Sequence, residues 1–179
     1  MHTRLSEVMG YADKARAELL ETVQKVDASR TLDRPADSPW SVRDVVEHLL
    51  LVEKSSLRAL FRTLRNAKEK GIAQETETNS LQPLIDDVER RIKTGRRVAP
   101  DYTRPSSEAT LPELVDQLKQ SREGLHSWAN EGDGSALDTI SFPHPALGEL
   151  SLYGWVVMLG AHERRHAEQI REIVTALGG

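Results

Sequence analysis

Residues 151–177 read SLYGWVVMLGAHERRHAEQIREIVTAL, and their apolar side chains recur every three or four positions. That spacing places one continuous stripe along a helix. The stripe consists of Leu152, Trp155, Leu159, His162, His166, Ile170, Ile173 and Leu177. Because two histidines lie in register with apolar residues, we expect both imidazoles to point into the interior of a helical protein.

Three further stretches have the same periodicity and predict long helices. The first runs from Thr3 to about residue 26, the second from a Ser41 cap to about residue 68, and the third from a Thr110 cap to a stop before Gly132. Asp44 follows Ser41, and Glu113 follows Thr110, at the spacing of residues that cap a helix start. Residues 70–110 form a long connection with a short amphipathic helix over 81–92 that ends near Gly95, and residues 135–150 are expected to be a loop.

Four long amphipathic helices predict an all-α fold, a four-helix bundle in one domain spanning residues 1–179. The second helix is roughly 40 Å long at about 1.5 Å per residue. A connection of about 40 residues can return the chain to the helix's starting end, which makes the second and third helices parallel. We therefore predict an up-down-down-up bundle.

Composition excludes several classes of function. The net charge is −4 and the pI is near 5.9, so no concentrated basic face for nucleic acid is expected. No apolar stretch approaches the roughly 18–20 residues of a membrane span, and the N-terminus lacks a secretory-signal layout. A cytoplasmic location is therefore the default expectation.

Cysteine is absent, which excludes disulfides, thiolate metal ligands and a cysteine nucleophile. Any metal must be held by His, Asp or Glu. Imidazole ligands favour Zn or Ni, with Fe, Co and Mn as further candidates. Any thiol chemistry would use a thiol supplied from outside.

His48, His162 and His166 are the candidate metal ligands. Positions 162 and 166 lie one turn apart on one helix face, and a third imidazole from a facing helix would complete a site with an open coordination position. Two hydrogen-bonded core histidines would be the ordinary interpretation of the pair alone. Burying both is costly unless both are satisfied, and His48 adds weight to the metal interpretation.

Gln169 could orient His166, and Asp44 could orient His48, through a hydrogen bond to the ring nitrogen that does not face the metal. For Asp44, a role at the helix start is favoured. Glu163 and Glu47 adjoin ligands but point partly aside, so neither is favoured as a catalytic base. His144 could be a fourth ligand or an acid–base group, but a loop or surface role is favoured. Surface positions are expected for His126 and His2, and core positions for Trp40, Trp128 and Trp155.

The combination Trp40-Ser41-x-x-Asp44-x-x-x-His48-Leu49, Gly148-x-Leu150-Ser151 and His162-Glu163-x-x-His166-x-x-Gln169-Ile170 resembles the DinB-like superfamily over nearly the whole chain. The resemblance implies an up-down-down-up bundle with one divalent metal held by His48, His162 and His166. It also implies frequent homodimers. Characterised members include metal-dependent transferases and isomerases that use small thiols such as bacillithiol, mycothiol or glutathione.

Three functional hypotheses follow. The leading one is a metal-dependent S-transferase, in which a low-molecular-weight thiol is activated at the metal and attacks a small electrophilic substrate. The second is hydrolysis by metal-activated water. The third is a helical bundle that binds a metal or a partner without turnover.

Overall fold

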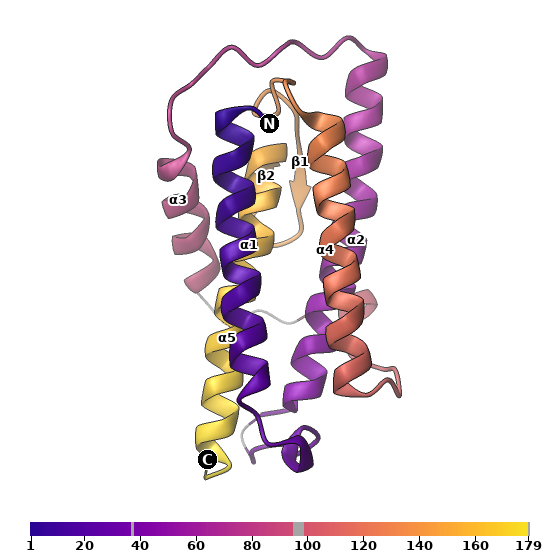
Figure 1. Ribbon diagram of the computed structural model, residues 1–179, viewed down its shortest axis with the longest axis vertical. Helices are drawn as coiled ribbons and strands as arrows, with labels where there is room; N and C mark the ends of the chain where they lie inside the picture. Colours follow the sequence, from indigo (N-terminus) through magenta and orange to yellow (C-terminus); the bar gives the residue numbers. More distant parts are fainter. Residues whose placement is uncertain (37, 95–98, 179) are drawn as a thin grey trace.

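The computed structural model describes residues 1–36, 38–94 and 99–178. Four long helices form a bundle, and a shorter helix packs on its side (Figure 1). The helices are α1 (Thr3–Gln24), α2 (Val42–Glu69), α3 (Gln82–Lys93), α4 (Leu111–Gly132) and α5 (Leu152–Ala176), with single 3-10 turns η1 (Ala28–Arg30) and η2 (Asp101–Thr103) and strands β1 (Ser141–His144) and β2 (Gly148–Ser151). None of the helices described here has an apolar stretch that could cross a membrane.

The predicted up-down-down-up topology is confirmed. α2 and α4 run side by side in the same direction, as do α1 and α5 (Figure 1). Lys54 donates to Gln117 and Lys68 to the carbonyl of Glu131, and both contacts join positions 63 apart, as a parallel pair requires. The connection from Lys70 to Thr110, which carries α3, crosses from one end of the bundle to the other and makes this arrangement possible.

The predicted helix starts are also confirmed. The Ser41 hydroxyl accepts from the backbone N–H of Asp44 at 3.2 Å, while the Asp44 carboxylate accepts from the backbone N–H of Ser41 at 2.9 Å. The Glu113 carboxylate accepts from the backbone N–H of Thr110 at 2.7 Å. These reciprocal bonds satisfy backbone N–H groups that have no partner within the helix. The predicted end of the short helix at Gly95 lies outside the described residues.

The loop expected over residues 135–150 was wrong in its second half, which forms a β-hairpin. β1 and β2 are antiparallel, with Ser141 opposite Ser151 and Pro143 opposite Glu149. Two prolines made this stretch resemble a loop, yet proline is tolerated on an edge strand, where its missing N–H has no ladder partner to lose. Phe142 stacks on Trp155 with ring centroids 4.3 Å apart, which fastens the hairpin to α5.

The long connection after α2 is held by a buried carboxylate. Glu75 accepts from Arg4 at 2.7 Å and from the Tyr153 hydroxyl at 2.9 Å. The backbone of the same segment bonds to the chain that follows α4, since the N–H of Glu75 donates to the carbonyl of Gly134. These contacts fix this end of the bundle.

A layer of four charged side chains divides the bundle core. Arg16, Glu53, Arg122 and Glu163 come from α1, α2, α4 and α5 respectively, and none is more than 6% exposed. On every long helix, one apolar cluster lies before this layer and a second lies beyond it. No motif or periodic pattern in the sequence predicts this layer.

Each arginine of the layer binds both glutamates. Arg16 lies 2.6 Å from Glu53 and donates from Nε to Glu163 at 2.8 Å. Arg122 donates to both carboxylate oxygens of Glu163 at 2.9 and 3.0 Å and lies 3.3 Å from Glu53. Two positive and two negative groups therefore compensate one another in an apolar surrounding, which is the condition under which buried charges are tolerated.

Replacing Glu163 by Gln should lower the free energy of unfolding by about 3 kcal/mol, because two buried arginines would then share one carboxylate. Chemical denaturation of the metal-free protein measures this loss. Glu168→Gln, an exposed position on the same helix, is the matched control and should change stability by less than about 0.5 kcal/mol. Equal stabilities for the two variants would show that the layer does not hold the bundle together.

Candidate metal centre

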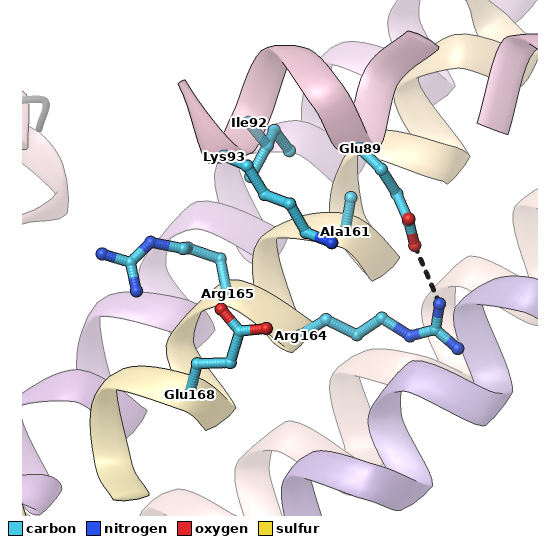
Figure 2. Close-up of a pocket in the computed structure, with 7 residues that line it drawn as sticks. All are labelled: Glu89, Ile92, Lys93, Ala161, Arg164, Arg165 and Glu168. Carbon is cyan, nitrogen blue, oxygen red and sulfur yellow. Dashed lines mark hydrogen bonds and ion pairs between the residues drawn. The ribbon is translucent and has the colours of Figure 1, made fainter. Parts of the chain in front are cut away.

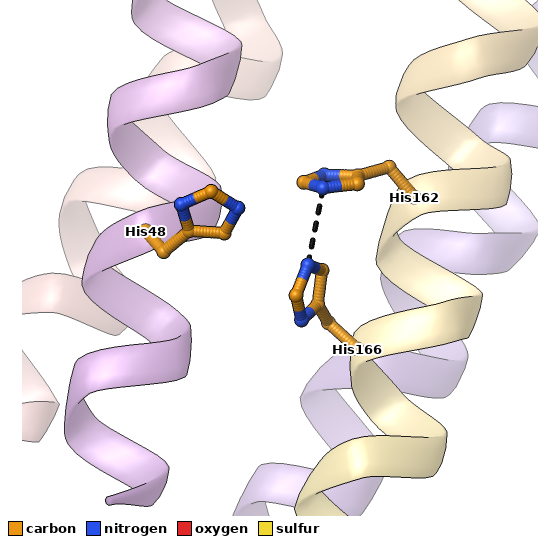
Figure 3. A group of neighbouring side chains, drawn as sticks. All are labelled: His48, His162 and His166. Carbon is orange, nitrogen blue, oxygen red and sulfur yellow. Dashed lines mark hydrogen bonds between the residues drawn. The ribbon is translucent and has the colours of Figure 1, made fainter. Parts of the chain in front are cut away.

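His48, His162 and His166 meet between two facing helices. His48 lies two turns into α2, and His162 and His166 lie one turn apart on α5, with all three rings directed into the space between the helices (Figure 3). The ring centroid of His48 is 5.2 Å from that of His162 and 5.0 Å from that of His166. One nitrogen from each ring can be chosen so that the three lie within 4.8 Å of one another.

The imidazoles of His48 and His166 are oriented by hydrogen bonds at their outer nitrogens. Nδ1 of His48 donates to the carbonyl of Thr103 at 2.8 Å, and Nδ1 of His166 donates to Oε1 of Gln169 at 2.7 Å. A proton held on Nδ1 leaves the lone pair on Nε2, the nitrogen needed for a metal. Nε2 of His166 lies 3.0 Å from Nε2 of His162.

The environment favours neutral imidazoles. Burial lowers the pKa of His48, and the hydrogen bond to Thr103 offsets part of that effect. Burial and the neighbouring His48 together lower the pKa of His166 to about 3. Since a metal binds the deprotonated nitrogen, these two rings are in the ligating form at neutral pH.

Gln169 contacts His166, the candidate ligand beside which the sequence predicted it. The carboxylate of Asp44 instead caps α2 and pairs with Arg34 and Arg43 at 3.0 and 3.1 Å. Asp44 therefore has the favoured helix-start role.

Sequence reasoning missed two neighbours of the centre. Thr103 contributes a backbone carbonyl, which carries no sequence signature because every residue has one. Trp40, expected in the core, is only partly buried, and its ring centroid lies 4.8 Å from that of His48. The ordered spacing from Trp40 to His48 was the only signal for this contact.

Neither neighbouring glutamate is placed as a catalytic base. Both oxygens of Glu163 accept from Arg122, inside the charged layer. Glu47 accepts from two backbone N–H groups of the segment after η2. Both carboxylates are already committed to positively polarised donors.

The remaining histidines lie apart from the centre. His144 is in the hairpin, where its Nδ1 accepts from the backbone N–H groups of Ala146 and Leu147, both at 3.1 Å. His126 is partly exposed and lies 3.2 Å from Asp13. His2 precedes α1 at the far end of the bundle. Among the described residues, the group that could hold a metal ion consists of the three predicted histidines.

A small pocket of about 100 Å³ lies between α3 and α5 (Figure 2). Its charged lining includes Lys93, Arg164 and Glu89, and the last two are paired at 2.8 Å. Its α5 residues lie on a different helix face from His162 and His166. This pocket is therefore separate from the histidine centre.

Comparisons with known proteins agree with this architecture. The uncharacterised protein YuaE of Bacillus subtilis (strain 168) is 24% identical over 169 residues, which cover 92% of this chain and 96% of that protein. The crystal structure of TT2238, described as a four-helix bundle protein, matches with a TM-score of 0.61 at 21% identity, over 94% of this chain and 98% of that one.

A second solved structure, an uncharacterised protein from Escherichia coli UTI89, matches with a TM-score of 0.59 at 16% identity, over 97% of this chain and 94% of that one. At these identities the two structures show the fold alone. The family model of the DinB superfamily matches residues 11–170, a span that includes all four long helices in part or in full and the three histidines. This chain therefore belongs to the DinB superfamily.

Proposed function

We propose that this protein binds one divalent metal ion through His48, His162 and His166. The observation that carries the proposal is the convergence of three imidazole nitrogens within 4.8 Å from two facing helices. The hydrogen bonds from His48 to Thr103 and from His166 to Gln169 support it, because a proton held on Nδ1 leaves the lone pair of Nε2 available to a metal. An all-nitrogen donor set favours Zn or Ni over Mg or Ca.

We further propose that the site serves a small-thiol-dependent transferase. A divalent cation held by three protein ligands would supply Lewis acidity and lower the pKa of a thiol beside it. The sulfur would form a bond to a carbon electrophile, the leaving group would depart with its bonding electrons, and the thiol proton would pass to solvent. The protein's own residues orient the ligands, and the absence of cysteine is consistent with a thiol that comes from outside.

Metal content is the first test. Wild-type protein, purified without a nickel column and supplied with Zn or Ni, should hold about one equivalent of metal, and His48→Ala and His166→Ala should lose it. His126→Ala is the matched control and should keep the full equivalent, since that histidine lies at the surface beside Asp13. A metal-free wild type, or a metal-loaded His48→Ala variant, would exclude the three-histidine centre.

Gln169→Ala should weaken metal affinity about 10- to 100-fold, because His166 would lose the partner that holds its Nδ1 proton. Competition with a coloured chelator measures the affinity. Gln117→Ala is the matched control, because that glutamine binds Lys54 on the exposed surface. An unchanged affinity in Gln169→Ala would mean that the hydrogen bond seen here does not tune the ligand.

Reactivity distinguishes the transferase from its alternatives. Cobalt-loaded protein titrated with glutathione, bacillithiol or mycothiol should develop a sulfur-to-metal charge-transfer band, and electrophile consumption should require the thiol. The rate should fall at least about 100-fold in His166→Ala. Turnover of esters or amides without a thiol would support metal-activated water instead, and metal binding with neither activity would support a non-catalytic bundle.

A further inference from the structure

Glu47 binds a segment of backbone that also contacts His48. It precedes His48 on α2, and its side chain is 4% exposed. Its Oε1 accepts from the backbone N–H of Ser106 at 3.0 Å and from that of Ser107 at 2.8 Å. A buried carboxylate that binds two successive N–H groups fixes the position of the chain that carries them.

Arg43, one turn earlier on α2, completes this attachment. Its guanidinium lies 3.0 Å from Oε2 of Glu47 and donates from Nε to the carbonyl of Ala109 at 2.8 Å. It also donates to the carbonyl of Ser107. Glu47 and Arg43 together therefore bind two N–H groups and two carbonyls of residues 106–109.

The same segment supplies the hydrogen-bond acceptor for His48. The Thr103 carbonyl accepts from Nδ1 of His48 at 2.8 Å, and Thr103 is 2% exposed. Only Arg104 and Pro105 separate Thr103 from the residues that Glu47 holds. Since the proline ring restricts its own backbone and that of Arg104, little slack remains between the two attachments.

We propose that Glu47 is a positioning residue for His48. By fixing residues 106 and 107, it holds the Thr103 carbonyl where it keeps the proton of His48 on Nδ1 and directs Nε2 toward His162 and His166. The expected effect on metal affinity rests on the proposed metal site. The hydrogen bonds through which Glu47 positions His48 do not depend on that proposal. Without Glu47, the segment would shift, and the ring of His48 would lose its fixed tautomer and orientation.

Two measurements test this proposal: the affinity for Zn and the tautomer of the His48 ring. Glu47→Ala should bind Zn about 10- to 100-fold more weakly than wild type in a chelator competition. Glu47→Gln, which keeps an acceptor oxygen for the two N–H groups, should recover part of the loss. This milder variant also gives a result if Glu47→Ala does not fold.

Glu75→Ala is the matched control for general damage. The side chain of Glu75 is also buried, accepts a backbone N–H, from Glu77, and pairs with an arginine. Its partners Arg4 and Tyr153 lie at the starts of α1 and α5, away from the histidines. Its replacement should leave Zn affinity within about twofold of wild type. Unchanged affinity in Glu47→Ala, or equal losses in both variants, would overturn the positioning role.

Nitrogen-15 NMR of the histidine rings in metal-free protein separates this proposal from the proposed function. Wild type should show His48, assigned through His48→Ala, protonated at Nδ1, and Glu47→Ala should show a mixture of tautomers. The Nδ1 tautomer retained in Glu47→Ala would refute the proposal. If wild type binds no metal, the proposed function fails, while this measurement still decides whether Glu47 positions His48.

Discussion

The buried layer of Arg16, Glu53, Arg122 and Glu163 sets the relative heights of the four long helices. Apolar side chains can slide by a fraction of a turn at modest cost, whereas ion pairs in a low-dielectric interior lose most of their energy when they separate. Each helix contributes one charge, so no helix can shift along its axis without breaking a contact. The layer is therefore the constraint on which the alignment of α2 with α5 depends.

That alignment matters because the candidate ligands lie beside the layer. Glu163 follows His162 directly on α5, and Glu53 lies five positions after His48 on α2. A shift of a single turn, about 5.4 Å, would move His48 out of reach of the pair on α5. The charges that align the helices thus also align the candidate ligands on α2 and α5.

Sequence patterns predicted what depends on local spacing. Helix caps such as Ser41 with Asp44 need only four consecutive residues, and His162 with His166 needs only one helical turn. The parallel pairing of α2 and α4 followed from the length of the connection between them. The prediction of a loop over residues 135–150 failed in its second half because Pro143 and Pro145 suggest a loop by composition. The stacking of Phe142 on Trp155 that stabilises the hairpin appears only in three dimensions.

The contacts that surround the centre could not be predicted for a different reason. Arg16 and Glu163 are 147 positions apart, and the bond from His48 to Thr103 spans 55 positions and ends on a backbone carbonyl. Neither leaves a periodic signal in one sequence. Residues 103–109 have little regular structure beyond η2, so their position depends on side chains of α2, chiefly Glu47 and Arg43.

The charged layer and the histidine centre connect different parts of the bundle. Two parallel helix pairs, α1 with α5 and α2 with α4, meet through apolar clusters above and below the charged layer. The charged layer joins all four helices through the protein's own groups, so the bundle can form before any metal binds. A metal on His48, His162 and His166 would add a link between the two pairs, and its stabilising effect would grow with the logarithm of the metal concentration relative to the dissociation constant. The folded chain by itself thus brings one nitrogen from each of the three candidate ligands within 4.8 Å of the others.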